Sequence, residues 1–516
     1  MERKKMRKGK VYLVGAGPGD NELLTMRAKE LIERCDVLIY DNLVSSRIVD
    51  MAPAACEKIY VGKSGSQHVM EQDEINRLIV EKSMAGGLVV RLKGGDPFIF
   101  GRGGEEALVC ADAGVDFEIV SGVSSAYAVP AYAGIPVTHR GLSSSVSFIT
   151  GHEDPTKDES DLNWEHLAKG AQTLVFLMGV KNLPMICEKL IENGLAPSTP
   201  AAVIENGCLP YQRTISGTLS TIAERASLAH IRPPSIIVIG DVVSLRDRIQ
   251  WFESRPLYGK RIVVTRSRQQ ASELTSMLAE FGADVIEMPV IRILPLDDPS
   301  PVLKAARELS LFDWIIFTSV NGVAEFFSII MREGLDARSL AGRRVGAIGD
   351  ATADALRRFG IIPDLIPPKF TSADMVRELA SRDEIRGKAF LLLRADIAPR
   401  DAIDDLLRQG AGRVVDVTAY RTVREIGADA DLLKQRINEG SIDLVTFTSS
   451  STADNFALIL RDIGVSPSSI VCAAIGPVTA ARARELGFTI SVIARTHTIP
   501  GLVEAVIAHF RGEWIQ

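Results

Sequence analysis

The chain has 516 residues, of which 24% are charged, and a net charge of −6. At one domain per ~150 residues this length predicts three or four domains, and the mildly acidic balance argues against a general nucleic-acid binder. We expect no membrane span, because no segment approaches the ~18 apolar residues that a span needs. The basic start MERKKMRKGK has no signal-type apolar run behind it, so we expect a cytoplasmic protein.

The first predicted strand, VYLV, leads into the loop VGAGPGD and then into the helical pattern LLTMRAKELI. A dinucleotide loop needs a third glycine where this sequence has Asp20. The carboxylate of Asp20 would face a diphosphate, and Pro18 removes one backbone donor. The loop is therefore predicted to serve another ligand.

Two later segments of the first part carry candidate site residues. Asp41 directly follows the apolar strand VLIY, and either caps a helix or acts chemically. In VVRLKGGDPFIFGRGGEE, Gly94 and Gly95 either form a tight turn or let the backbone approach a ligand closely. Asp96 could accept hydrogen bonds from ribose hydroxyls or an amino group.

Strands such as LVVRLKG and TLVFLMG alternate with helical patterns along the chain, which is typical of α/β domains with mainly parallel sheets. The pattern pauses at WFESRPLYGK, and a new series begins with RIVVTRS. We therefore predict a boundary between domains 1–252 and 257–516. The six cysteines and seven histidines show no metal-ligand spacing, so we predict no bound metal.

The second domain contains an internal repeat. DWIIFTSVNGV resembles DLVTFTSSSTA, in which Thr448 lies 130 residues after Thr318, and VGAIGDATA resembles CAAIGPVTA, in which Gly476 lies 127 residues after Gly349. The near-equal spacing predicts two similar α/β lobes. Strand ends and helix N-termini of this kind suit anionic ligands.

Residues 10–251 resemble the tetrapyrrole methylases, and among them the uroporphyrinogen-III C-methyltransferases, through VGAGPGD, YDNLVS, VRLKGGDPFIFGRGGEE, AGIPVTHR and TLVFLMG. The resemblance implies two α/β lobes of about 10–120 and 125–250, a homodimer formed through this part, and S-adenosylmethionine as methyl donor. It implies that Asp41 is the catalytic base and that Lys63 and Arg102 bind substrate carboxylates. The residues implied to contact S-adenosylmethionine, Met178 among them as a catalytic contact, are Pro18, Gly94, Gly95, Asp96, Ile99, Ser124, Ser125, Met178 and Ala202. Ser121 and the Ser124-Ser125 pair depart from the family's usual proline and threonine-alanine.

Residues 257–512 resemble uroporphyrinogen-III synthases through GKRIVVTR, FTSVNGV, AIGDATA, AYRT and IGPVTA. This resemblance implies one lobe from 257–293 with 424–512 and another from 296–420. It implies that Tyr420 assists departure of a hydroxyl group, although a half-buried strand tyrosine is an equal interpretation. Ser449 and Thr479 are candidate carboxylate binders or helix caps.

The two resemblances together predict a bifunctional enzyme. The second part would cyclise hydroxymethylbilane to uroporphyrinogen III with ring D inversion, and the first part would methylate that product twice, at C2 and C7, to precorrin-2 on the way to sirohaem or cobalamin. A non-catalytic tetrapyrrole-binding or regulatory module is the alternative for the second part. We expect only these small-molecule partners, and no nucleic acid or membrane.

Overall fold

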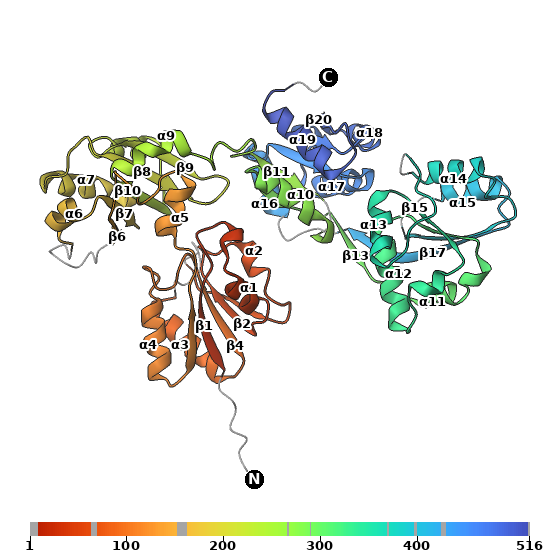
Figure 1. Cartoon of the computed structure of the whole chain (residues 1–516), viewed down its shortest axis with the longest axis horizontal. Coiled ribbons are helices and arrows are strands. Elements are labelled where there is room, and N and C mark those ends of the chain that lie inside the picture. The colour runs from red at the N-terminus through yellow and green to blue at the C-terminus, as the bar shows by residue number, and fades with distance from the viewer. Residues whose placement is uncertain are drawn as a thin grey trace, which may run out of the picture. The chain divides into compact units, whose positions relative to one another are not determined.

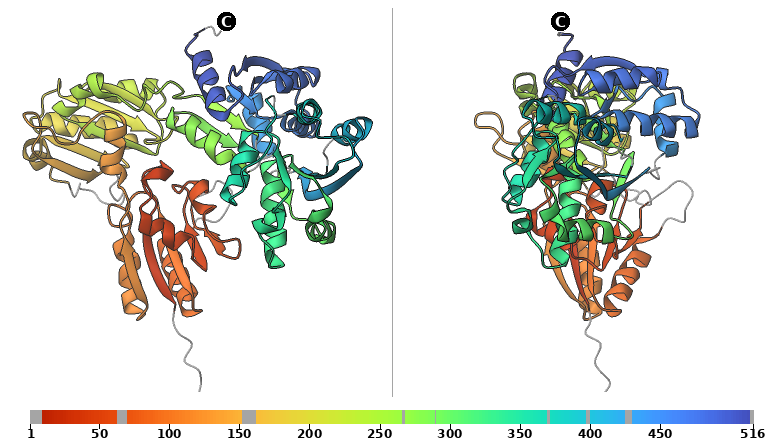
Figure 2. Two further views of the ribbon diagram at one scale, coloured as in Figure 1. Left: turned by 45° about the vertical axis from the view of Figure 1, so that its right-hand side comes forward. Right: turned by 90° about the vertical axis from the view of Figure 1, so that its right-hand side faces the viewer.

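The computed structural model describes residues 9–62, 70–151, 162–265, 268–288, 290–368, 371–396, 400–424 and 430–513. The chain divides into two compact units, residues 1–260 with 278–284 and residues 261–277 with 285–516. The described residues form four five-stranded sheets, each with helices around it (Figures 1 and 2). The predicted α/β class is confirmed.

The first lobe is a parallel sheet in the order β3-β2-β4-β1-β5. Its strands are β1 (Lys10–Gly15), β2 (Val37–Tyr40), β3 (Glu57–Tyr60), β4 (Leu88–Lys93) and β5 (Asp116–Val120). Its helices are α1 (Met26–Ile32), α2 (Ser46–Val49), α3 (Gln72–Met84) and α4 (Gly103–Asp112). Figure 1 shows α1 and α2 on one face of the sheet and α3 and α4 on the other.

Alternation along the strands explains this two-faced packing. Val11 and Leu13 pack into the apolar cluster with residues of α3 and α4, whereas Val14 packs with residues of α1 and α2. In β4, Val89 belongs to the α3/α4 cluster. The alternation therefore turns the two charged residues of this strand, Arg91 and Lys93, toward the layer of α3 and α4.

The second lobe has the sheet order β6-β7-β10-β8-β9, in which β10 runs antiparallel to both neighbours and β9 antiparallel to β8. Its strands are β6 (Val146–Thr150), β7 (Thr173–Leu177), β8 (Pro200–Glu205), β9 (Arg213–Thr218) and β10 (Ser235–Ile239). Its helices are α5 (Ser125–Tyr132), α6 (Trp164–Gly170), α7 (Leu183–Glu192), α8 (Ile222–Leu228) and α9 (Arg246–Ile249). This sheet is more mixed than the alternating pattern predicts, because a short connection joins β8 to the antiparallel β9, and β10 enters between β7 and β8 after helix α8.

The second unit begins and ends in a sheet of order β12-β11-β18-β19-β20. Its strands are β11 (Arg261–Val264), β12 (Asp284–Glu287), β18 (Leu444–Phe447), β19 (Val471–Ala474) and β20 (Thr489–Ile493). Its helices are α10 (Arg268–Glu280), α16 (Ala430–Asn438), α17 (Ser450–Ile463), α18 (Pro477–Glu485) and α19 (Ile499–Phe510).

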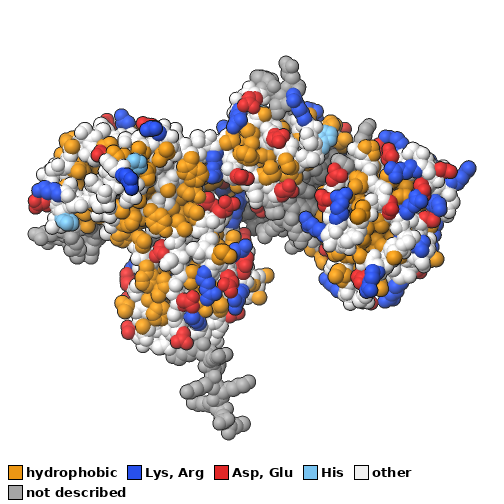
Figure 3. Space-filling view, in the orientation of Figure 1, with side chains coloured by type: hydrophobic (Ala, Val, Ile, Leu, Met, Phe, Trp, Pro, Cys, Tyr) orange, Lys and Arg blue, Asp and Glu red, His pale blue; other side chains and the backbone are white. Residues whose placement is uncertain are grey.

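The remaining sheet has the order β13-β17-β16-β14-β15, parallel except for β13. Its strands are β13 (Ile291–Leu294), β14 (Trp314–Phe317), β15 (Arg344–Ala347), β16 (Ala389–Ala395) and β17 (Arg413–Arg424). Its helices are α11 (Ser300–Arg307), α12 (Val320–Arg332), α13 (Asp350–Arg358), α14 (Ser372–Ser381) and α15 (Asp401–Arg408). This sheet begins at Ile291, a few residues before the start of its lobe at 296 expected from the sequence. On the face in view, cationic and anionic side chains of this lobe are intermixed (Figure 3).

Candidate functional site

Three glycine loops cross at the carboxyl ends of β1, β4 and β5. Gly17 and Gly95 exchange backbone hydrogen bonds, with N–O distances of 3.2 and 2.7 Å. A β-carbon on Gly122 would lie 2.2 Å from the Gly95 oxygen, and one on Gly15 would lie 2.5 Å from the Gly122 α-carbon. The glycines of VGAGPGD therefore allow close contact between backbones at this edge of the sheet.

Gly95 is packed less tightly than the neighbouring glycines. Its φ of +68° favours glycine, and a β-carbon there would meet no heavy atom nearer than 3.7 Å, the Ser125 nitrogen. At Gly94, by contrast, a β-carbon would lie 2.6 Å from the Leu43 β-carbon. Gly95 is itself buried, so its predicted close approach to a ligand stays a prediction, and the half-buried Ile99 follows in the same loop.

Asp96 fastens this loop to its neighbour. Its Oδ1 accepts a hydrogen bond from the Phe98 amide at 2.8 Å, and its Oδ2 accepts one from the Gly122 amide at 3.0 Å. The side chain is buried. Asp96 thus holds the loops together, and any contact with a ligand would use the remaining lone pairs of the same carboxylate.

Asp20, which occupies the place of the third glycine, binds within the protein. Its Oδ1 accepts a hydrogen bond from the Glu22 amide, and its Oδ2 accepts one from the Tyr132 hydroxyl at 2.7 Å. Burial, together with this hydrogen bond, raises the pKa of Tyr132. The carboxylate therefore connects the first loop to helix α5, and the half-buried Pro18 lies two residues before it.

Ser124 and Ser125 begin helix α5 beside Gly95. Ser124 is buried, and its Oγ caps the helix by accepting a hydrogen bond from the Ala126 amide at 3.2 Å. The half-buried Ser125 is the first helical residue, and its amide faces the space beside Gly95.

The second lobe offers one exposed candidate and one buried candidate. Met178 directly follows β7, adopts φ +58°, and is 53% exposed. A left-handed conformation is rare for a non-glycine residue, and such strained residues cluster at functional sites. Ala202 in β8 is fully buried in the apolar cluster that α5 covers. Its side chain is enclosed by apolar residues, and its predicted contact with S-adenosylmethionine stays a prediction.

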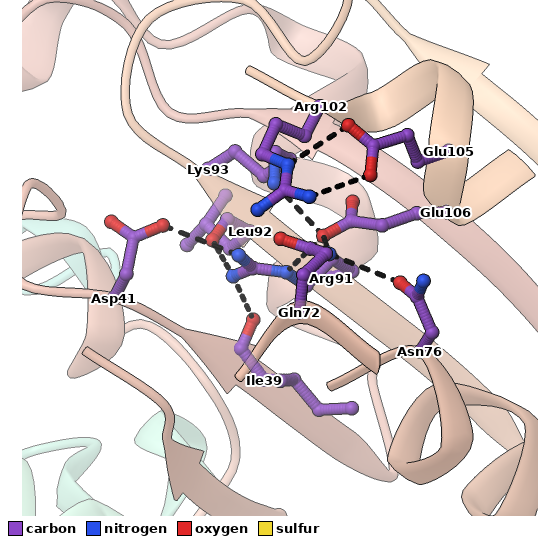
Figure 4. A network of polar contacts seen from close by, with 10 residues as sticks. All are labelled: Ile39, Asp41, Gln72, Asn76, Arg91, Leu92, Lys93, Arg102, Glu105 and Glu106. Atoms are coloured by element: carbon purple, nitrogen blue, oxygen red, sulfur yellow. Dashed lines mark hydrogen bonds and ion pairs between the residues drawn. The ribbon is translucent and has the colours of Figure 1, made fainter. Parts of the chain in front are cut away.

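Asp41 lies at the end of β2, beside a buried ionic network (Figure 4). Its Oδ1 accepts a hydrogen bond from the Leu43 amide at 3.1 Å, and its Oδ2 lies 3.4 Å from Nη2 of Arg91. Arg91 and Lys93 both bind Oε1 of Glu106 on α4, at 3.1 and 2.9 Å. The carboxylate of Asp41 is therefore part-exposed, and the buried guanidinium of Arg91 holds it from the interior of the lobe.

The two candidate carboxylate-binding residues of this unit are Arg102 and Lys63. Arg102 begins α4 in a left-handed conformation and forms two hydrogen bonds to the Glu105 carboxylate, at 2.8 and 2.7 Å. Both side chains are more than half exposed, so this pair can open to a substrate at little cost. Lys63 lies outside the described residues.

In the second unit, each copy of the repeat ends a strand in a serine that caps the next helix. Ser319 follows β14, and its Oγ accepts a hydrogen bond from the Gly322 amide at 3.1 Å. Ser449 follows β18, and its Oγ accepts one from the Thr452 amide at 3.3 Å. Thr479 is buried in the first turn of α18. Ser449 is thus a helix cap, and its predicted role toward a carboxylate stays a prediction, as does that of Thr479.

Tyr420 in β17 contacts Ser319, the capping serine that follows β14. Its hydroxyl lies 3.0 Å from Oγ of Ser319, while its ring belongs to the apolar core of the lobe. Burial raises the pKa of the phenol, so Tyr420 keeps its proton at neutral pH.

The residues beneath Asp41 are not among the candidates predicted from the sequence. The signal was present in VVRLK, where two cations interrupt a strand that is otherwise buried. Buried charges need partners, so Arg91 and Lys93 predict a nearby carboxylate. Glu106 supplies it from the next helix, together with Gln72 of α3, whose amide lies 3.3 Å from the same oxygen.

Within the described ranges, no group of three or more His, Cys, Asp or Glu side chains is arranged to hold a metal ion. Among the helices of the same residues, none is both long and apolar enough to cross a membrane.

Comparison with known proteins follows the division of the chain. The family model for tetrapyrrole (corrin/porphyrin) methylases matches residues 10–223, and the model for uroporphyrinogen-III synthase HemD matches residues 272–504. A relative from Ruminiclostridium josui, named porphyrin biosynthesis protein HemD, is 38% identical over 502 residues, which cover 97% of this chain and 98% of that protein. The chain belongs to the tetrapyrrole methylases fused to uroporphyrinogen-III synthases. Both resemblances found in the sequence are thereby confirmed.

Further relatives match the methylase unit. An S-adenosyl-L-methionine-dependent uroporphyrinogen III methyltransferase from Methanosarcina barkeri (strain Fusaro / DSM 804) is 56% identical over 239 residues, which cover 46% of this chain and 94% of that protein. A solved Thermus thermophilus uroporphyrin-III C-methyl transferase complexed with S-adenyl homocysteine is 40% identical and covers 46% of this chain and 100% of its own, with a TM-score of 0.40. The M. barkeri relative bears out the predicted cofactor.

The synthase unit has a more distant counterpart. A mutant uroporphyrinogen III synthase from the extremely thermophilic bacterium Thermus thermophilus is 18% identical and covers 49% of this chain and 100% of its own, with a TM-score of 0.38.

Proposed function

We propose that this fusion enzyme carries out two consecutive reactions. The synthase unit cyclises hydroxymethylbilane to uroporphyrinogen III with inversion of ring D, and the methylase unit adds two methyl groups, at C2 and C7, to give precorrin-2. The observation that carries the proposal is the presence of both families on one chain, together with a relative that spans 97% of it. One unit thereby consumes what the other produces.

In the methylase unit, the chain's own residues bind and orient the reactants. S-adenosylmethionine would supply an electrophilic methyl group beside the Gly95 loop, with Ser125 and the exposed Met178 as further contacts. Asp41 would take up the pyrrole proton, because its carboxylate is part-exposed and its Oδ2 lies 3.4 Å from Nη2 of Arg91, which orients it. Arg102, with Lys63, would bind substrate carboxylates. Positioning of this kind supplies much of the rate of a methyl transfer.

In the synthase unit, the strand ends offer hydroxyl groups and helix N-termini. Hydroxymethylbilane readily loses hydroxide, so the enzyme mainly has to direct ring closure. Tyr420 can donate its proton to the leaving hydroxyl, because burial keeps the phenol protonated. Ser449 and Thr479 would bind substrate carboxylates near the starts of α17 and α18.

The test uses the full chain with hydroxymethylbilane, first without and then with S-adenosylmethionine. We expect the type III isomer in the first reaction and its dimethylated product in the second, separated by chromatography. Formation of only the spontaneous type I isomer would identify the second unit as a non-catalytic tetrapyrrole-binding module.

The proposal also covers the oligomeric state of the protein and its cellular compartment. We propose a homodimer formed through the methylase unit and a place in the cytoplasm, without nucleic-acid partners. Light scattering of the full chain measures the oligomeric state, and a monomer at micromolar concentration would contradict the dimer.

A further inference from the structure

The carboxylate of Glu106 lies at the centre of the buried network beneath Asp41 (Figure 4). The residue is 1% exposed. Its Oε1 accepts hydrogen bonds from Arg91 Nε at 3.1 Å, Lys93 Nζ at 2.9 Å and Gln72 Nε2 at 3.3 Å. Its Oε2 is buried without a hydrogen-bond partner among the described residues. A purely structural ion pair gains most when both oxygens are bonded, so this one-sided arrangement needs another explanation.

Arg91 links Glu106 to Asp41. One edge of its guanidinium binds Glu106 through Nε, and Nη1 donates a hydrogen bond to the Leu92 oxygen at 3.0 Å. Nη2 lies 3.4 Å from Oδ2 of Asp41. The planar group is thus held at two sides and presents its remaining edge to the carboxylate. A change at Glu106 would be transmitted to Asp41 through one rigid side chain.

The charges of the network balance. Arg91 and Lys93 offset Glu106 and Asp41, and three of the four side chains are at most 7% exposed, whereas that of Asp41 is 21% exposed. Burial and the charge of Arg91 lower the pKa of Lys93, while Glu106 and Asp41 oppose this effect. Asp41 therefore interacts with both cations of the network, Arg91 and Lys93.

Among the described residues, Arg102 and Glu105 also interact with this network, Arg102 with Glu106 and Glu105 with Lys93. On α4, Arg102 and Glu105 pair with each other near the surface. On α3, Asp73 acts on Arg102. Lys63 lies outside the described residues. The removal of one buried charge is therefore poorly compensated, and its effect should reach Asp41.

We infer that Glu106 is a positioning residue for Asp41: through Arg91 it orients the Asp41 carboxylate, and with Lys93 it sets the net charge beneath that carboxylate. The inference rests on the proposed role of Asp41 as base. Glu106 itself touches no reactant.

Two single substitutions with opposite expected effects test this inference in the full chain. Glu106→Gln removes a negative charge, which favours ionised Asp41 and moves the acidic limb of the methylation pH–rate profile down by about 0.5 pH unit. Lys93→Met removes a positive charge and moves the same limb up by a similar amount. Glu106→Gln should also lower kcat about tenfold, because the charge-assisted hydrogen bonds that orient Arg91 become weaker neutral ones, and Glu106→Asp should restore part of that loss.

The control is Glu57→Gln, which breaks an exposed ion pair to Lys82 in the same lobe and should leave the profile in place. Calorimetry with S-adenosylmethionine shows whether each variant is folded. If Glu106→Gln does not fold, Lys93→Met still gives a shift of defined sign. The inference would be overturned if the acidic limbs of both variants stayed in place, or if both moved in the same direction.

Asp41→Asn separates this inference from the proposed function. If Asp41 is the base, the variant loses the acidic limb together with most of the rate. Retention of both would remove Asp41 as the base and overturn the inference with it. If Asp41→Asn loses the acidic limb and the rate, but the limbs of the Glu106 and Lys93 variants do not shift, the inference is overturned and the proposed role of Asp41 as base is kept.

Discussion

The Tyr420 hydroxyl lies 3.0 Å from Oγ of Ser319, a residue 101 positions earlier in the chain. Ser319 at the same time caps helix α12 through the Gly322 amide. Tyr420 is 5% exposed, and burial raises the pKa of its phenol. The contact places a protonated hydroxyl group at the start of a helix, where the macrodipole favours developing negative charge.

Replacement of this tyrosine tests its part in ring closure. We expect Tyr420→Phe to slow synthase turnover at least about tenfold, or ~1.4 kcal/mol in the barrier, if the hydroxyl assists the leaving group. Methylation of supplied uroporphyrinogen III should remain unchanged and serves as the control for folding. A wild-type synthase rate would leave Tyr420 as a packed core residue.

Ser319→Ala separates the cap from the hydroxyl. The variant should lower the free energy of unfolding by about 1 kcal/mol, because helix α12 loses its N-cap. Its synthase rate should fall less than that of Tyr420→Phe, since the phenol is kept. Denaturant unfolding and turnover measure the two effects, and an equal loss of rate in both variants would point to the pair as one unit.

Gly95 should matter for ligand binding as well as for backbone conformation. Its φ of +68° costs another residue about 1–2 kcal/mol of stability, while a β-carbon there meets nothing nearer than 3.7 Å. We expect Gly95→Val to fold but to weaken S-adenosylmethionine binding at least about tenfold, measured by calorimetry, because its side chain fills the space beside the loop. Gly194→Ala is the control, with positive φ and open surroundings. Unchanged affinity in Gly95→Val would show that Gly95 serves only the turn.

We expect Met178 to lower the stability of the fold through its backbone conformation and to favour methylation through its side chain. Because it adopts φ +58°, Met178→Gly should raise the free energy of unfolding by about 0.5–1 kcal/mol, even after the greater entropy of the unfolded glycine chain. The same change removes an exposed apolar contact, so methylation should become slower. Urea unfolding and turnover test both parts, and a gain in stability with full activity would exclude Met178 from the site.

Asp41→Asn should lower methylation by about 10²- to 10⁴-fold, the usual effect of losing a general base. The asparagine oxygen can still accept the Leu43 hydrogen bond, so the fold and the affinity for S-adenosylmethionine should be kept. If Asp41 served only this local turn, asparagine would replace it without loss. Single-turnover methylation with saturating reactants distinguishes these outcomes.

Much of this protein could be predicted from local sequence. The alternation of strands and helices identifies the α/β class, since the periods of two and 3.6 residues are local properties. The repeated Thr-Ser and Ile-Gly pairs predict equivalent strand ends, and the structure places Ser319 and Ser449 as equivalent helix caps. Capping depends on residues within one turn, so its signal lies within a few positions of the sequence.

Contacts between distant segments required the tertiary structure. Glu106, Gln72 and Arg91 come from three elements, and only the packing of α3 and α4 on one face of β4 brings them to one carboxylate oxygen. The burial of Ala202 likewise depends on helix α5 covering a strand whose sequence is apolar on both faces. The identity of the chemical groups and their positions on strands and helices follow from local sequence. The tertiary structure decided which of those groups meet, because burial and charge pairing depend on what each face of a sheet is packed against.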